Sequence, residues 1–373
     1  VAGVLWPSKK FADTQLIPGA AAGINSVISN AMLVAELERL KSSSDTSAAA
    51  PQLKGTFAPA DADAKLTQAQ QLVPKLENDP AARQQFADLL RSLLPAQGQA
   101  VDIDAAAKFR SLSGEQLFDK LKTPPPATAM PPGTLAGGPA SAAAAGHAAG
   151  IGSSFFGGIK AAAMNVLNLT TYYQMKERAG LVGQSGVNEL LRRIRADEQL
   201  KGLKLHAVGH SFGCRLLSAA TAGPDARHSV KIDSMTLLQG AFSHYGFSDK
   251  YDNAGHPGFF RRVLSDHLVA GPILVSHTRN DRAVGTMYPL ASRLAGQVAS
   301  AVGDPSDQYG GLGSNGAQKT PEAAAGQLED VGFAYAFGPG KVSNLNADKF
   351  IQGHSDITNP QTAYAFLKAL ATT

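Results

Sequence analysis

The segment GHSFG at residues 209–213 has the pattern G-x-S-x-G, with Ser211 at its centre. In this pattern a tight turn between a strand and a helix lifts the serine Oγ above the edge of a sheet, and glycine avoids collisions within the turn. The apolar run LKLHAV precedes the pentapeptide, and the Ala/Leu-rich run CRLLSAATA follows it. Because these flanks fit a strand and a helix, we predict that Ser211 is a nucleophile and not part of an ordinary glycine-rich turn.

A serine hydroxyl needs a base that takes its proton, and in this strand-turn-helix setting the order along the chain is Ser, acid, His. Of the nine histidines, His354 fits this order best. It lies in the loop QGHSD, after a strand-like segment within 341–351 and before the last predicted helix. We therefore predict that His354 is the base, with His256 as the leading substitute.

The acid is expected in a loop after a strand, because ligands bind at the carboxyl ends of parallel strands. Asp281 follows the predicted strand 272–276 within a short loop. A carboxylate there would hold the imidazole in the required tautomer, whereas the alternative is a solvated aspartate or a partner of Arg279 or Arg282. The other carboxylates considered are Asp249 and Asp252 as fallback acids, and Asp356 for a supporting contact near the histidine.

An oxyanion hole needs two backbone N–H donors, and the residue after the nucleophile, Phe212, supplies the first. The second donor is unknown from the sequence. If VAGVLW at 1–6 is the strand before the elbow strand, the loop that carries the second donor lies upstream of residue 1 and the native N-terminus is missing. If the loop is WPSK at 6–9, a further strand is needed before residue 202.

These residues require a sheet that brings distant loops to one edge. Apolar, β-forming runs predict strands at 1–6, 203–208, 234–238, 272–276 and, more weakly, within 341–351. Helical spacing of apolar residues predicts helices at 19–40, 211–222 and 359–370, and a pair within 155–200 that breaks at 180–186. The alternation of strands and helices indicates an α/β fold with a doubly wound, mostly parallel sheet that lacks its first strands.

The segment 42–122 interrupts this pattern and reads as a helical insertion, with amphipathic helices at 66–76, 86–94 and 117–121. Residues 123–154 are rich in Pro, Ala and Gly and predict a flexible linker. We therefore expect residues 1–41 and 155–373 to form the core domain. The insertion is a candidate lid and a candidate surface for protein contact.

Composition narrows the functional classes. The chain has 373 residues, 44% of them hydrophobic, and a net charge of +4 without a basic cluster, so nucleic-acid binding is not expected. The single cysteine, Cys214, excludes an internal disulfide and a Cys-based zinc site. No metal or cofactor motif is present, and no run of about 20 clean apolar residues predicts a transmembrane segment. We expect a soluble, cytoplasmic protein.

Three segments resemble the α/β-hydrolase superfamily: the elbow LHAVGHSFG, the loop SHTRNDRAVG and the late GHSD. The likeness covers residues 1–41 and 155–373, and TTYYQMKERAGLVG at 170–183 is similar to bacterial hydrolases of unassigned substrate. The resemblance implies a catalytic triad of Ser211, Asp281 and His354. It also implies an esterase-, lipase- or thioesterase-like enzyme acting on a small-molecule or lipid ester, without a cofactor.

Two alternatives to a hydrolase stay open. The scaffold could transfer its acyl group to an alcohol or amine, or it could be a non-catalytic module that acts through the helical insertion. Two further features are ambiguous. The glycine-rich run at 310–316 favours a flexible surface loop, and a group of aromatic residues between two strands fits either a substrate pocket or ordinary core packing. That group comprises Phe242, Tyr245, Phe247, Tyr251, Phe259 and Phe260.

Overall fold

A computed structural model describes residue 3 and residues 28–41, 59–95, 106–122, 158–281, 283–284, 294 and 308–373. The chain divides into two compact units. The first comprises residues 1–96, 105–174 and 290–302, and the second comprises residues 97–104, 175–289 and 303–373. Within the described residues, none of the helices combines the length and the apolar character needed to cross a membrane.

The first unit is helical. Its core is apolar, and the rings of Phe86 and Phe118 meet edge to face with centroids 6.1 Å apart. Asp79 caps one helix by accepting from the N–H groups of Ala81 and Ala82, and Ser113 begins another with a capping box. Its elements are α2 (Asn30–Leu40), α3 (Ala62–Leu72), η2 (Val73–Lys75), α4 (Pro80–Arg91), α5 (Ala106–Ser111), α6 (Gly114–Leu121) and the first part of α8 (Ile159–Val182).

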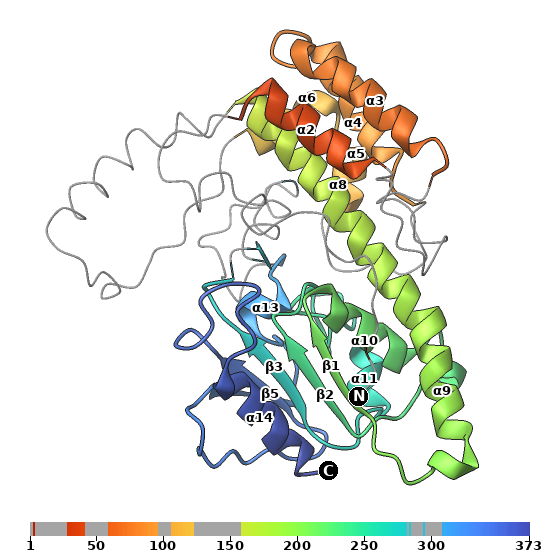
Figure 1. Ribbon diagram of the computed structural model, residues 1–373, viewed down its shortest axis with the longest axis vertical. Coiled ribbons are helices and arrows are strands. Elements are labelled where there is room, and N and C mark those ends of the chain that lie inside the picture. Colours follow the sequence, from red (N-terminus) through yellow and green to blue (C-terminus); the bar gives the residue numbers. More distant parts are fainter. Residues whose placement is uncertain are drawn as a thin grey trace, which may run out of the picture. The chain divides into compact units, whose positions relative to one another are not determined.

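The second unit contains a five-stranded sheet in the order β1-β2-β3-β5-β4, in which all paired neighbours are parallel (Figure 1). This arrangement makes the unit an α/β structure. The strands are β1 (His206–His210), β2 (Ser234–Leu238), β3 (Ile273–His277), β4 (Ala323–Gln327) and β5 (Val342–Asn346).

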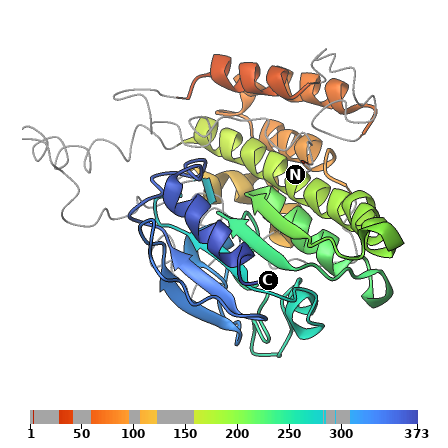
Figure 2. The same ribbon diagram turned by 60° about the horizontal axis from the view of Figure 1, so that its bottom comes forward.

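Helices cover both faces of the sheet (Figures 1 and 2). Ile273 and Val275 of β3 join a core cluster with Cys214, whereas the intervening Leu274 joins a second cluster with Ala365. Since successive side chains of a strand point to opposite faces, the two clusters lie on opposite sides of the sheet. The helices of this unit include α9 (Asn188–Ala196), η4 (Glu198–Leu200), α10 (Phe212–Ala222), η5 (Ala226–His228), α11 (Arg261–Ser265), α13 (Leu312–Asn315) and α14 (Pro360–Leu370).

The long apolar strands were predictable, and one weak strand was not. The prediction of 234–238 is confirmed by β2, 272–276 falls within one residue of β3, and 341–351 contains β5. The elbow strand begins later than expected, at His206, where its pairing with β2 starts. The sequence AAAGQ of β4 lacks β-branched residues and is mostly exposed at the sheet edge, so no apolar pattern marks it. The predicted strand 1–6 lies outside the described residues except for residue 3.

The expected break at 180–186 is a π-helical segment, η3 (Gly183–Val187), which joins α8 to α9 without interrupting the helix. A Cβ on Gly183 would lie 2.2 Å from the carbonyl oxygen of Leu216. The glycine therefore permits α10 to approach closely, and the wider turn accommodates that contact.

The unit boundaries differ from the expected domains. Residues 30–40, expected in the core domain, belong to the helical unit. The α2 helix buries Leu33, Leu37 and Leu40, and the side chain of Gln70 in α3 donates to the Val34 carbonyl at 3.0 Å. An amphipathic helix shows which face is buried, but its sequence does not identify the partner.

Candidate active site

Ser211 lies between β1 and α10 and has φ 57° and ψ −125°. This left-handed conformation is strained for a residue with a side chain and typically costs about 1–3 kcal/mol. A Cβ on Gly209 would lie 2.7 Å from the backbone carbonyl carbon and oxygen of Gly213, so the first glycine of the pentapeptide is required sterically. A Cβ on Gly213 would meet no atom within 4 Å among the described residues, contrary to our expectation for the second glycine.

The structure brings the three predicted residues together. The Nε2 atom of His354 lies 2.8 Å from the Oγ of Ser211, and its Nδ1 lies 2.8 Å from Oδ2 of Asp281. Asp281 is 1% exposed, and its Oδ1 accepts a hydrogen bond from the N–H of Val284 at 3.0 Å. With a proton on Nδ1, His354 would donate to Asp281 and accept from the serine hydroxyl.

Two neighbouring strands position Asp281 and His354. Asp281 follows β3, and His354 lies in the loop after β5, which pairs with β3 in parallel register. Ser211 follows β1 at the same end of the sheet, where its N–H donates to the Leu238 carbonyl at the end of β2. The three side chains therefore meet at the carboxyl ends of the strands, as the sequence predicted.

The substitutes considered for the base and acid lie elsewhere. The Nδ1 atom of His256 lies 2.7 Å from Oδ2 of Asp252, and His256 is exposed. Asp249 lies 3.9 Å from Arg261. Asp356 accepts from the N–H of Gln352 at 2.9 Å and thereby closes the loop that carries the base.

His210, inside the elbow, has a contact that the sequence did not reveal. Its Nε2 lies 2.7 Å from the carbonyl oxygen of His354, and the two imidazole rings have centroids 4.7 Å apart. A hydrogen bond donated by this nitrogen ties the backbone of His354 to the residue directly before Ser211. Because the contact joins residues separated by 144 positions, local sequence carries no signal for it.

The predicted first oxyanion donor lies at the start of a helix. Phe212 is the first residue of α10, directly after Ser211, and the N-terminus of a helix favours negative charge. The two sequence hypotheses for the second donor, upstream of residue 1 and at 6–9, fall outside the described residues.

The glycine-rich run 310–316 is buried, so the prediction of a flexible surface loop is wrong. Gly313 donates to the Gly240 carbonyl and accepts from the N–H of Thr278, both at 2.9 Å, and so bridges the loops after β2 and β3. A Cβ on Gly313 would lie 2.6 Å from the carbonyl carbon of Gln239. The glycines therefore serve close packing beside the site and not surface flexibility.

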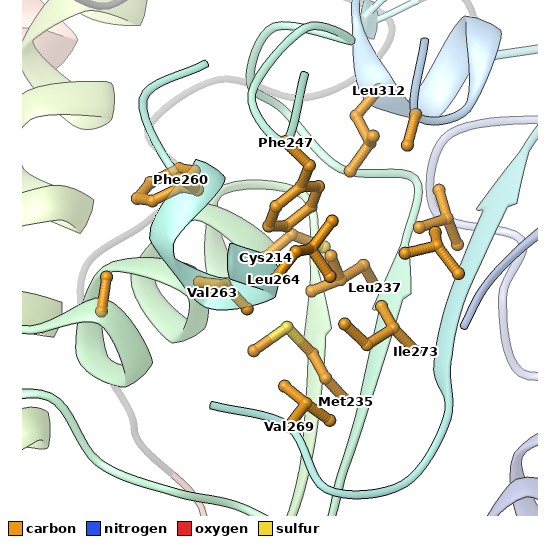
Figure 3. Packing of buried hydrophobic residues seen from close by; sticks show 14 of the residues in the cluster. Cys214, Met235, Leu237, Phe247, Phe260, Val263, Leu264, Val269, Ile273 and Leu312 are labelled. Atoms are coloured by element: carbon orange, nitrogen blue, oxygen red, sulfur yellow. The ribbon is translucent and has the colours of Figure 1, made fainter. Parts of the chain in front are cut away.

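Most of the aromatic group forms core and not an open pocket. Phe242, Phe247 and Phe260 are at most 1% exposed and belong to the same cluster as Cys214. Figure 3 shows Phe247, Phe260 and Cys214 in this cluster. Tyr245 is 2% exposed. This favours the core-packing alternative for these four residues, whereas Tyr251 and Phe259 are partly exposed.

Within the described residues, no group of three or more His, Cys, Asp or Glu side chains could hold a metal ion. Burial raises the pKa of the Cys214 thiol, so this cysteine stays protonated and is no nucleophile. Comparisons of the chain with protein-family models, curated proteins and solved structures give no match.

Proposed function

We propose that this chain is a serine hydrolase of the α/β-hydrolase type that cleaves a carboxylic ester or thioester through an acyl-enzyme. The supporting observation is the continuous hydrogen-bonded series from Ser211 through His354 to Asp281, with both heavy-atom distances at 2.8 Å. Each member has the chemistry its role needs: a hydroxyl, an imidazole and a buried carboxylate.

In the proposed reaction, the Oγ of Ser211 attacks the substrate carbonyl while Nε2 of His354 takes the hydroxyl proton. His354 then gives this proton to the leaving alcohol or thiol, and an acyl-serine remains. A water molecule attacks the acyl-serine with His354 again as base, which releases the acid and restores the serine.

Asp281 acts through His354. Its carboxylate accepts from Nδ1–H, which presents the lone pair of Nε2 to the serine, and its negative charge stabilises the imidazolium that forms during attack. The N–H of Phe212, at the start of α10, donates to the carbonyl oxygen of the substrate and stabilises the negative charge that develops there.

The test is reaction of the purified chain with a fluorophosphonate, with the labelled residue located by mass spectrometry. We expect labelling at Ser211 in the wild type and none at this position in Ser211→Ala. His354→Gln and Asp281→Asn should slow labelling by roughly a thousandfold or more, since members of such a triad act as a unit.

The chain supplies matched controls. His256 and Asp252 form a histidine–aspartate pair with a 2.7 Å contact but lie in the loop 251–257, in which residues 253–257 are exposed. His256→Gln and Asp252→Asn should therefore label at the wild-type rate. A folded wild-type chain that does not react at Ser211, or a His354→Gln variant that reacts as fast as the wild type, would refute the proposal.

A further inference from the structure

Asp348, in the turn after β5, is hydrogen-bonded to the loop that carries the acid. Its Oδ1 accepts from the Thr278 hydroxyl at 2.8 Å and from the N–H of Arg279 at 2.9 Å. Its Oδ2 accepts from Nε of Arg279 at 3.0 Å, and Nη2 of the same guanidinium lies at 3.0 Å. One carboxylate therefore binds two consecutive residues just before Asn280 and Asp281.

The backbone around Asp348 strengthens the same connection. The side-chain amide of Asn280 donates to the carbonyl oxygens of Asp348 at 3.0 Å and Ile351 at 2.9 Å. The N–H of Ala347 donates to the His277 carbonyl at 2.8 Å. The segments 277–280 and 347–351 are thus joined directly before the residues that carry the acid and the base.

We propose that Asp348 is a positioning residue that sets the distance between Asp281 and His354 by clamping the loop after β3 to the loop after β5. This inference rests on the proposed function and deepens it. It gives Asp348 no contact with substrate.

The environment of Asp348 favours its charged form. Burial works to raise the pKa of this carboxyl, but hydrogen bonds from the Arg279 N–H, the Thr278 hydroxyl and the Arg279 side chain outweigh it and lower the pKa. The charged and titratable groups that face it are Arg279 and His277. A carboxylate is therefore maintained at neutral pH.

The difference in exposure between Arg279 and Asp281 shows why the loop after β3 needs a clamp. The side chain of Arg279 is 63% exposed, whereas that of Asp281, two residues later, is fully buried. The acid loop thus runs from solvent to the buried site within a few residues, and its hydrogen bonds must fix its course. A misplacement of about 1 Å can reduce catalysis by about a hundredfold.

The experiment compares Asp348→Ala, Asp348→Asn, Arg279→Ala and the double variant Asp348→Asn/Arg279→Ala. Hydrolysis of p-nitrophenyl butyrate gives kcat and KM, with active sites counted by fluorophosphonate labelling. We expect Asp348→Ala to lower kcat by about tenfold or more, with KM changed less than about twofold. Asp348→Asn keeps an acceptor for the Thr278 hydroxyl but loses the ion pair with Arg279. Its kcat should therefore equal that of Arg279→Ala. The double variant should have the same kcat as either single variant, because both changes remove the same ion pair.

The pH profile separates positioning from general stability. A poorly placed Asp281 stabilises the imidazolium less, so the acid limb of kcat should move to lower pH in Asp348→Ala. Loss of folded protein would lower the number of labelled sites without moving this limb.

The Arg261–Glu322 pair is the matched control. It is bidentate, with distances of 2.7 and 2.6 Å, and the Glu322 side chain is 26% exposed against 25% for Asp348. Glu322→Gln should leave kcat per labelled site and the pH profile unchanged.

The outcomes separate the two proposals. If the wild type labels at Ser211 while Asp348→Ala keeps wild-type kcat and acid limb, the clamp is refuted and the hydrolase stands. The same holds if Glu322→Gln reproduces the Asp348→Ala change. If the wild type does not label, the proposed function fails, and the positioning role fails with it.

Discussion

Backbone geometry at single residues decides where the Ser211 hydroxyl lies. Ser211 is held at a positive φ, and Gly209 lets the strand pass within van der Waals contact of the helix start. We expect Gly209→Ala to lower the free energy of unfolding by about 1–3 kcal/mol, because its Cβ would lie 2.7 Å from backbone atoms that cannot easily move. Urea denaturation followed by circular dichroism measures this.

Gly213→Ala is the control at the other glycine of the pentapeptide. Gly213 lies in α10, and a Cβ there meets no described atom within 4 Å. Since alanine favours a helix, this change should leave stability unchanged or raise it slightly. Equal losses in the two variants would contradict the steric explanation.

Single residues also show what the sequence could and could not predict about the site. Chain order and flanking strands were enough to single out Ser211, Asp281 and His354, because each of the three follows a strand of one sheet. His210 and Asp348 were missed because their roles depend on pairing between segments 144 and 69 residues apart. No local pattern distinguishes an aspartate in such a turn from a solvated one.

Among the elements, prediction succeeded where a strand or helix buries a continuous apolar face. It failed for β4, whose side chains are mostly small and exposed. It also failed for 310–316, because glycine is equally typical of close packing and of a flexible loop. Asp233, directly before β2, makes a contact that the apolar pattern of the sequence does not reveal. Oδ2 of Asp233 accepts from the Leu205 N–H at 2.7 Å and from Arg195 at 2.5 Å.

This carboxylate joins the chain before β1 to the chain before β2. Burial opposes its charge, but the hydrogen bond from Leu205 and the pair with Arg195 lower the pKa of Asp233. We expect Asp233→Ala to reduce the free energy of unfolding by about 1–3 kcal/mol in urea denaturation. Asp266→Ala, which removes an exposed partner of Arg262 at 3.2 Å, should cost less than about 1 kcal/mol. A comparable cost for both would contradict the proposed link.

For the whole molecule, a half-buried histidine, His277, makes the free energy of unfolding depend on pH. Burial lowers the pKa of His277 from its ordinary 6.5, although Asp348 works to raise it. Below that pH the unfolded chain binds a proton that the folded chain does not. The free energy of unfolding should therefore fall as pH drops from about 7 to 5.

Denaturation in urea across this range provides the measurement. His277→Gln should flatten the dependence, whereas His267→Asn, at an exposed position with φ 50°, should keep the wild-type slope. An unchanged slope in His277→Gln would show that other groups control the pH response.

The strand order also determines when during synthesis Ser211 and His354 can meet. β5 separates β3 from β4, so β4 has no neighbour in the described sheet until β5 has been translated and inserted. His354 comes 143 residues after Ser211 and 73 after Asp281. A nascent chain on the ribosome therefore displays Ser211 without its base, and under the proposed mechanism the nucleophile gains its reactivity only when the last strand closes the sheet.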